Sequence, residues 1–195
     1  MSELTPLAVA ALGLLEERPM HPYEMYQVLM QRSEDRLLKV RPGSLYHAVD
    51  RLARGGHVRA TGTEREGNRP ERTTYEITDA GSVALQARLS AMLGEYVNEY
   101  PVFPLAIGES HNLAPDAVAT LLEARLAGLR QELADYHVGR QTVTAKGLPE
   151  AYWLDIDYKI TLLQTEIEWH QATIARLQSG DLTWNPEHTK ESNRP

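Results

Sequence analysis

The sequence predicts a mostly α-helical chain: an N-terminal winged helix-turn-helix of three helices and a β-hairpin wing, then a linking helix and a C-terminal antiparallel helical hairpin. Three observations predict this fold. Three short segments with helical spacing of apolar residues come first, and each begins at a proline. A stretch with period-two alternation follows them. Two long helical segments then occupy most of the second half, separated by a short loop.

The three short helices have clear starts and stops. The first, over residues 6–17, is apolar almost all round, which is typical of a helix buried on most sides. The second is predicted over residues 22–32. The third begins at Pro42 and stops at the pair Gly55 and Gly56, a plausible C-terminal cap. A short helix follows a short helix, as in a helix-turn-helix.

After the third helix the period changes from helical to alternating. Residues 58–62 and 73–77 alternate, and between them lies EREGNRPER, residues 64–72, with turn signals at Gly-Asn and Pro. This pattern predicts a β-hairpin with a charged tip. Thr78 is then suited to cap a fourth helix, which we expect over residues 79–98.

The second half predicts two long helices, over residues 115–143 and 150–178. Apolar residues of the second recur at steps of four and three, at Ile156, Ile160, Leu163, Ile167, His170, Ile174 and Leu177. This heptad spacing is typical of a coiled coil. Because two helices have few residues to cover both stripes, we expect packing against a second subunit. The alternative is that the stripes cover each other, with the fourth helix, inside one chain.

These elements predict four parts. They are a winged helix-turn-helix domain at 1–78, a connecting helix and linker at 79–112, a helical dimerisation and effector domain at 113–179, and a flexible tail at 180–195. Prolines at 101 and 104 and Gly108 predict the linker.

Composition excludes several classes of site. The chain has no cysteine, which excludes disulfides and thiolate chemistry, and its seven histidines are scattered, so we expect no metal and no cofactor. The longest apolar run, Leu7 to Leu15, is too short to span a membrane and has no basic segment before it. We therefore expect a cytoplasmic protein without a membrane partner.

The charge is distributed unevenly. Residues 36–72 contain nine Lys or Arg and four acidic residues, a net charge of +5, whereas residues 79–195 contain nine basic and sixteen acidic residues, a net charge of −7. A basic segment in an acidic protein indicates an anionic partner for that segment. On charge alone, a solvated surface is an equal alternative.

Three stretches resemble the PadR family of transcriptional regulators: LGLLEERPMHPYEMYQVL, LKVRPGSLYHAVDRLARGGHV and REGNRPERTTYEITDAG. The resemblance covers residues 7–85 in order, and the C-terminal helical pair is similar in layout to the dimerisation domain of the family's Vir-type class. It implies a homodimeric repressor that binds an inverted repeat of double-stranded DNA through the third helix and the wing. It also implies release by a small apolar or phenolic ligand.

The resemblance also implies contacts and differences at single residues. Family contacts with DNA carry over onto Tyr23, Ser44, Tyr46, Gly67 and Arg69. The family usually has His-Gly-Tyr where this chain has Pro at position 22, and proline removes an N–H that could hold a phosphate. At position 47 this chain has His where proline is common, which changes the donors offered to DNA.

The third helix itself indicates a DNA-binding surface. Positions 44, 47, 51 and 54 share one face, and the N–H groups at the helix start are suited to phosphate. We expect Asp50 on the same side to orient Arg51 or Arg54. The predicted DNA contacts are Tyr23, Lys39, Arg41, Gly43, Ser44, Tyr46, His47, Arg51, Arg54, Arg65, Gly67, Arg69 and Arg72.

Two further sets of residues are predicted. The dimerisation residues are Leu89, Met92, Tyr96, Ile156, Ile160, Leu163, Ile167 and Ile174. Aromatic residues that could line an effector cavity are Tyr96, Phe103, Trp153 and Trp169. The alternative for these rings is an ordinary core or dimer interface, where aromatic side chains are common.

The regulator hypothesis has two competitors. The first is a winged-helix protein-interaction module with a coiled-coil dimer stem and no operator; the basic face of the third helix favours the regulator over it. The second is an enzyme, which we do not expect. Paired carboxylates at 155 and 157 point to different faces of a helix, and the sequence has no nucleophile elbow or phosphate-binding glycine loop.

Overall fold

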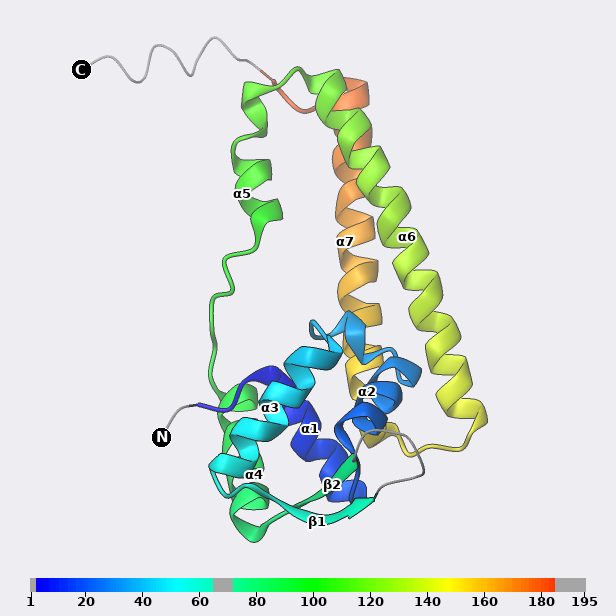
Figure 1. Cartoon of the computed structure of the whole chain (residues 1–195). Helices are drawn as coiled ribbons and strands as arrows, with labels where there is room; N and C mark the ends of the chain where they lie inside the picture. Colours follow the sequence, from blue (N-terminus) through cyan, green and yellow to red (C-terminus); the bar gives the residue numbers. More distant parts are fainter. Residues whose placement is uncertain (1–2, 65–71, 185–195) are drawn as a thin grey trace, which may run out of the picture. The chain divides into compact units, whose positions relative to one another are not determined.

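A computed structural model describes residues 3–64 and 72–184 of the chain (Figure 1). It divides into two compact units, Met1–Asn98 and Glu99–Pro195, and each is described by itself. Within the described residues, no helix is both long enough and apolar enough to cross a membrane. The predicted tail lies mostly outside these residues, and the predicted four-part division stays a prediction.

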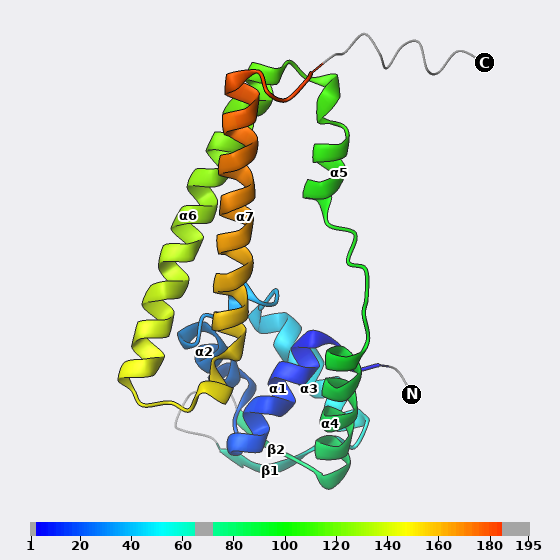
Figure 2. The same cartoon turned by 180° about the vertical axis from the view of Figure 1, so that it is seen from behind.

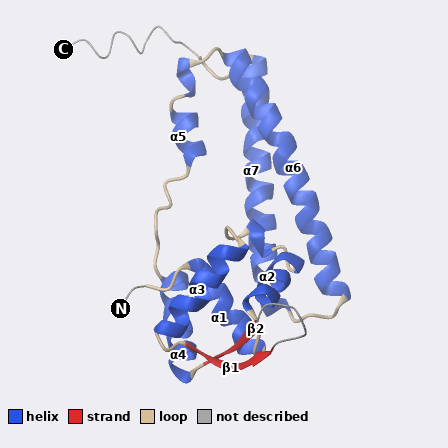
Figure 3. Ribbon diagram, in the orientation of Figure 1, coloured by secondary structure: helices blue, strands red, loops and turns tan. Residues whose placement is uncertain are grey.

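The first unit has the order of elements that the sequence predicts. Its elements are α1 (Pro6–Glu17), α2 (Pro22–Gln31), a 3₁₀ turn (Glu34–Arg36), α3 (Pro42–Arg54), β1 (Val58–Glu64), β2 (Arg72–Ile77) and α4 (Asp79–Gly94) (Figure 3). The winged-helix fold is therefore confirmed. The 3₁₀ turn was not predicted, and α4 ends four residues before the expected residue 98. It ends at a glycine, a poor helix former, and the next residue, Glu95, is extended.

Helix α1 is at the centre of this unit, as its all-round apolar sequence predicts. Ala11 and Leu12 are fully buried, and α1 packs against α3, α4 and β2. From α3, Leu45 and Val49 enter the same core, together with Leu29 of α2. One face of α3 is thereby fixed to the domain, which leaves its other face outside.

The two strands pair antiparallel and are tied to the chain before α2. The register joins Val58 to Ile77 and shifts between Ala60 and Gly62, which forms a bulge. Met20 and Tyr75 exchange two backbone hydrogen bonds of 3.0 Å, so the segment before α2 extends the sheet by one bridge. The base of the wing is therefore held from two sides.

The start of α4 is locked onto the turn after α3. The hydroxyl of Thr78 accepts from the N–H of Gly81 at 3.1 Å and donates to the carbonyl of Gly56 at 2.7 Å. The N–H of Thr78 donates to the carbonyl of His57 at 3.0 Å. Gly81 has no room for a side chain, because a β-carbon there would overlap the His57 carbonyl. This contact holds α3, the wing and α4 in one arrangement.

The second unit is an antiparallel helical hairpin with a short helix before it. Its elements are α5 (Val102–Gly108), a 3₁₀ turn (Ser110–Asn112), α6 (Pro115–Ala145), a 3₁₀ turn (Glu150–Tyr152) and α7 (Leu154–Ser179). Figures 1 and 2 both show α6 and α7 side by side along most of their length. The predicted hairpin is confirmed.

The linker predicted at the end of residues 79–112 contains a short helix, α5, which the sequence analysis did not predict. Pro101 is the N-cap of α5, and Pro104 lies in its first turn. Proline is tolerated there because the first N–H groups of a helix have no partner within the helix. The two prolines therefore start a helix here and do not interrupt one.

The predicted seam of α7 is covered within a single chain. Ile160, Leu163, Ile167 and Ile174 are buried in one core with the apolar side chains of α6, and Ile156 packs on its edge. The expectation that a second subunit covers this seam was therefore wrong, and the intramolecular alternative describes it. The physical reason is that α6 is long and presents a matching stripe, Val118, Leu122, Leu126 and Leu129.

Candidate nucleic-acid interface

Helix α3 separates its apolar and polar side chains sharply. Leu45, Ala48, Val49 and Leu52 are buried, with at most 2% of their surface exposed. All the residues predicted to meet DNA on and before this helix are exposed: Lys39, Arg41, Gly43, Ser44, Tyr46, His47, Arg51 and Arg54. The structure therefore brings these eight residues together around one helix.

The N-terminus of α3 carries no side-chain cap. Arg41 is the N-cap residue and makes no capping hydrogen bond, and Pro42 has no N–H. In the same unit the other three α-helices are capped by side chains, α1 by Thr5, α2 by His21 and α4 by Thr78. The N–H groups that begin α3 are thus free of a side-chain cap and can donate hydrogen bonds to an anion, which is the usual ligand of an open helix N-terminus.

The N-terminus of α2 is closed, in contrast. The N–H of Tyr23 donates to Nδ1 of His21 at 3.0 Å, and Pro22 has no N–H. The carboxylate of Glu24 binds Arg18 at 2.6 Å and accepts from the backbone N–H of His21. These two hydrogen bonds form a capping box. Tyr23 is exposed, so its side chain, but not its N–H, is available to DNA.

The two arginines of α3 differ in their surroundings. The guanidinium of Arg51 makes no hydrogen bond or ion pair with any described residue. Arg54 donates to the backbone carbonyl of Asp50 at 3.4 Å, a weak contact. Of the two arginines that Asp50 was expected to orient, it contacts Arg54, and through its backbone carbonyl. Arg51 therefore has its full donor set available.

Other arginines of the first unit are neutralised by carboxylates. Arg32 binds Glu17 through two hydrogen bonds of 2.6 and 2.8 Å, and Arg18 binds Glu24. The hydrogen bond from Arg32 lowers the pKa of Glu17, and the bond from Glu17 raises the pKa of Arg32. These pairs place neutralised charge on α1 and α2. Among the described residues of this unit, Arg41, Arg51 and Arg54 at α3 form no ion pair with a carboxylate.

The wing is described only at its base. Arg65, Gly67 and Arg69 lie outside the described residues, and Arg72 begins β2 opposite Glu64. Arg59 on β1, which the sequence analysis did not select, is exposed and forms an ion pair with Glu76 across the strands. The cross-strand position of this carboxylate could be found from the pairing register and not from the chain order.

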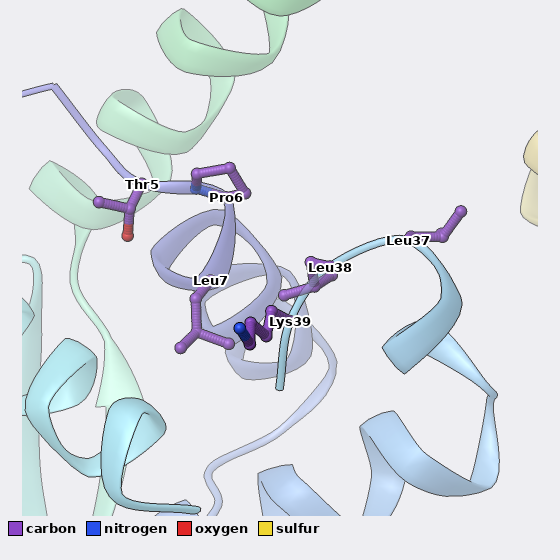
Figure 4. Close-up of a pocket in the computed structure, with 6 residues that line it drawn as sticks. All are labelled: Thr5, Pro6, Leu7, Leu37, Leu38 and Lys39. Atoms are coloured by element: carbon purple, nitrogen blue, oxygen red, sulfur yellow. The ribbon is translucent and has the colours of Figure 1, made fainter. Parts of the chain in front are cut away.

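Beside Lys39 the surface is hollowed. The hollow is lined by Thr5, Pro6, Leu7, Leu37, Leu38 and Lys39, and Figure 4 shows the start of α1 facing the segment before α3. Its walls come from two separated stretches of sequence, so the sequence analysis did not find it. Apart from the threonine and the lysine, the lining is apolar.

The predicted dimerisation residues fall into two groups. Leu89, Met92 and Tyr96 are exposed on and after α4, and the exposed fraction of Tyr96 is 94%. The α7 residues of the prediction belong to the hairpin core, as described above. The other side of α7 carries large apolar residues that are exposed and follow helical spacing: Leu154, Tyr158, Leu162 and Trp169.

Within the second unit, the aromatic residues predicted for an effector cavity do not all come together. Trp153 precedes α7 and donates its indole N–H to the carbonyl of Leu148 at 3.2 Å. Trp169 lies sixteen residues further on, a rise of about 24 Å in a helix. Tyr96 belongs to the other unit. Only Phe103 and Trp169 are neighbours, with ring centroids 6.0 Å apart.

Phe103 and Trp169 are part of a cluster that includes a cation. The ring of Phe103 stacks on His170 at 5.1 Å, and the guanidinium of Arg125 lies 4.0 Å from the same ring. Arg125 also binds Glu166 at 2.7 Å. Nδ1 of His170 bonds to the carbonyl of Glu166 at 2.7 Å, while Nε2 is buried without a partner among the described residues. Arg125 and His170 were not predicted as site residues.

The first unit matches a known family of regulators. Residues 11–87 match the family described as the Transcriptional regulator PadR-like family, so this segment is a PadR-like domain. No curated protein sequence matches the chain.

Solved structures of PadR proteins share the fold over most of the chain. A crystal structure of Bacillus subtilis PadR in complex with operator DNA has 18% identity and a TM-score of 0.76, covering 90% of this chain and 99% of that one. The same protein in complex with p-coumaric acid has 16% identity and a TM-score of 0.72, with 88% and 98% covered. The PadR-like regulator BC1756 from Bacillus cereus has 14% identity and a TM-score of 0.66, with 89% and 99% covered.

Proposed function

We propose that this chain, whose residues 11–87 form a PadR-like transcriptional regulator domain, is a sequence-specific DNA-binding repressor that acts as a homodimer. The observation that carries the proposal is the exposed side of α3. It combines an open helix N-terminus with Arg51, which no described residue engages. Both features are suited to a polyanion that also presents base edges.

In this proposal α3 enters the major groove, as second helices of helix-turn-helix motifs do. The N–H groups of Gly43 and Ser44 bind a phosphate, and Lys39 and Arg41 before the helix bind the backbone. Arg51 reaches a guanine edge, for which its guanidinium is the most common partner. His47 and Tyr46 add contacts beside it, and Arg54 meets the backbone at the far end of the helix.

The wing supplies the second contact. Arg65, Arg69 and Arg72 are proposed to hold phosphates or enter the minor groove, where a narrow groove concentrates negative potential. The bridge between Met20 and Tyr75 fixes the base of the hairpin, which supports this role. Arg59 contributes less, because Glu76 already neutralises it.

The dimer is proposed to form through exposed apolar residues. Leu89, Met92 and Tyr96 remain as predicted contacts, and the outer stripe of α7, from Leu154 to Trp169, adds a second surface. Such patches on a helical surface are typical of subunit interfaces. A two-fold dimer would match an operator with two inverted half-sites.

The proposal includes a small effector molecule that releases the repressor from DNA. A solved relative of the same fold binds p-coumaric acid, which is a phenolic ligand. In this chain Phe103 and Trp169, with Arg125 and His170 beside them, form an aromatic cluster where a small apolar or phenolic molecule could act. The proposal includes no catalysed reaction, and a cytoplasmic location follows from its DNA partner.

Selection of bound duplexes from a random DNA pool with the purified full-length protein tests the proposal. We expect an enriched inverted repeat with half-site centres about one helical turn, roughly 34 Å, apart. Absence of any enriched sequence would overturn the proposal and favour the alternative, a winged-helix module that binds protein partners. Competition by unlabelled random DNA distinguishes specific binding from purely electrostatic binding.

A further inference from the structure

His21 lies between the two helices of the helix-turn-helix and contacts both of them. Its Nδ1 accepts the N–H of Tyr23 at the start of α2. Its ring and the ring of Tyr46 on α3 form a T-shaped contact, with centroids 5.8 Å apart and an angle of 75° between the planes. Tyr46 belongs to the exposed side of α3 that is proposed to meet DNA.

The orientation of the imidazole is set from the α2 side. The cap to Tyr23 requires Nδ1 to face the helix axis, and the carboxylate of Glu24 holds the backbone N–H of the same histidine. Arg18 in turn fixes Glu24. Held in this way, the imidazole makes its T-shaped contact with Tyr46.

The hydroxyl of Tyr46 is not held by a hydrogen bond to any of the described residues, and 44% of the residue is exposed. A side chain that is free before binding must be immobilised when the complex forms, and this lowers affinity. The edge contact with His21 restricts the ring before DNA arrives.

We infer that His21 is a positioning residue for DNA binding: the α2 cap fixes its imidazole, and the imidazole fixes Tyr46 on α3. The inference rests on the proposed function, because it assumes that Tyr46 meets DNA. It makes affinity depend on the ring at position 21 more than on the capping hydrogen bond of the same side chain.

Two substitutions separate these roles. His21→Phe keeps an aromatic edge and removes the cap, whereas His21→Asn keeps a capping acceptor and removes the ring. His21→Ala removes both, and Tyr46→Ala provides the second side of a double-mutant cycle. Each full-length variant is titrated by fluorescence anisotropy against the duplex enriched by the wild type, at pH 8, where an ordinary imidazole is neutral.

We expect His21→Ala and His21→Asn to weaken binding by about three- to tenfold, which corresponds to one additional side chain to be immobilised. His21→Phe should keep affinity within about twofold while lowering the melting temperature, since the cap is lost. In the Tyr46→Ala background, His21→Ala should have no further effect on affinity.

Two results would overturn the inference. One is additivity, in which His21→Ala weakens binding equally with and without Tyr46. The other is the reverse ranking, with Asn retaining affinity and Phe losing it, which would show that the cap alone matters. A wild-type protein that enriches no duplex would instead refute the proposed function, and melting curves of every variant establish that each is folded.

Discussion

Gly81 at the start of α4 lies directly against the carbonyl oxygen of His57, with no space for a side chain between them. A methyl group at this position would push α4 away from the turn after α3. Gly81→Ala should therefore lower the free energy of unfolding by about 1–3 kcal/mol, the usual cost of overpacking. Urea denaturation followed by circular dichroism measures it. Gly13→Ala is the control: it meets open space in α1 and should be neutral or stabilising.

Arg51→Ala should weaken binding to the enriched duplex by about 1–3 kcal/mol, because the proposed guanine contact is lost. Binding to unrelated duplexes should change much less. Arg130→Ala, an exposed arginine of α6, serves as the matched control and should leave affinity unchanged. An Arg51→Ala protein with wild-type affinity and specificity in a gel-shift titration would remove this residue from the interface.

Arg69→Ala should reduce the slope of log affinity against log salt concentration by about one, as expected for one lost phosphate contact. Arg59→Ala should change the slope less, since its charge is already paired with Glu76. Titrations at several salt concentrations give both slopes. Equal slopes for the wild type and Arg69→Ala would show that the wing does not bind phosphate through this residue.

The ion pair between Glu17 and Arg32 predicts a small acid sensitivity. The hydrogen bond from Arg32 lowers the pKa of Glu17 in the folded state, so the contribution is complete above the ordinary carboxyl value. It begins to be lost as the pH falls below that ordinary value and is gone once the pH has fallen through the lowered pKa of the folded state. Because the pair is exposed, the contribution is less than about 1 kcal/mol.

Glu17→Gln should therefore be slightly less stable than the wild type at pH 7, and the difference should shrink toward pH 3. Denaturant unfolding at both pH values measures it. Glu16→Gln is the control, because this neighbour forms no ion pair with a described residue. A difference between Glu17→Gln and the wild type that stays constant from pH 7 to pH 3 would contradict the assignment.

Substitutions of buried apolar residues should affect stability, whereas substitutions of exposed apolar residues should affect the proposed dimer. Leu163→Ala should lower the stability of the hairpin by about 2–5 kcal/mol, because Leu163 is almost fully buried. Met92→Lys changes an exposed residue of α4 and should leave unfolding nearly unchanged while shifting the proposed dimer toward monomer. Sedimentation velocity and denaturation together distinguish the two. Dissociation by Leu163→Ala without loss of stability would contradict its place in the core.

Local sequence signals predict much of this fold. A proline after a capping residue marks the start of α1 and α2, and the spacing of the apolar residues in α3 separates its buried face from its exposed one. The side chains of α3 that are proposed to meet DNA are therefore exposed where the sequence predicts them. These signals succeed because each depends only on residues within a few positions of one another.

Features that depend on contacts between distant segments were not predicted. The cross-strand partner of Arg59, the ring contact between His21 and Tyr46, and the position of Arg125 over Phe103 all join separate elements. The partner of the buried α7 residues was predicted wrongly for the same reason: a heptad pattern does not show which helix packs against it, and here it is α6 of the same chain. Spacing defines a surface but not its partner.

The missing side-chain cap at the start of α3 lowers the stability of the fold but leaves N–H groups available for the proposed DNA contact. A serine or aspartate in place of Arg41 could supply the missing cap, and such caps stabilise proteins by about 0.5–2 kcal/mol. The same change would occupy the N–H groups offered to phosphate and remove a positive charge. Selection of this protein for heat resistance would therefore favour substitutions at position 41 that weaken the proposed binding to DNA, a compromise common at functional sites.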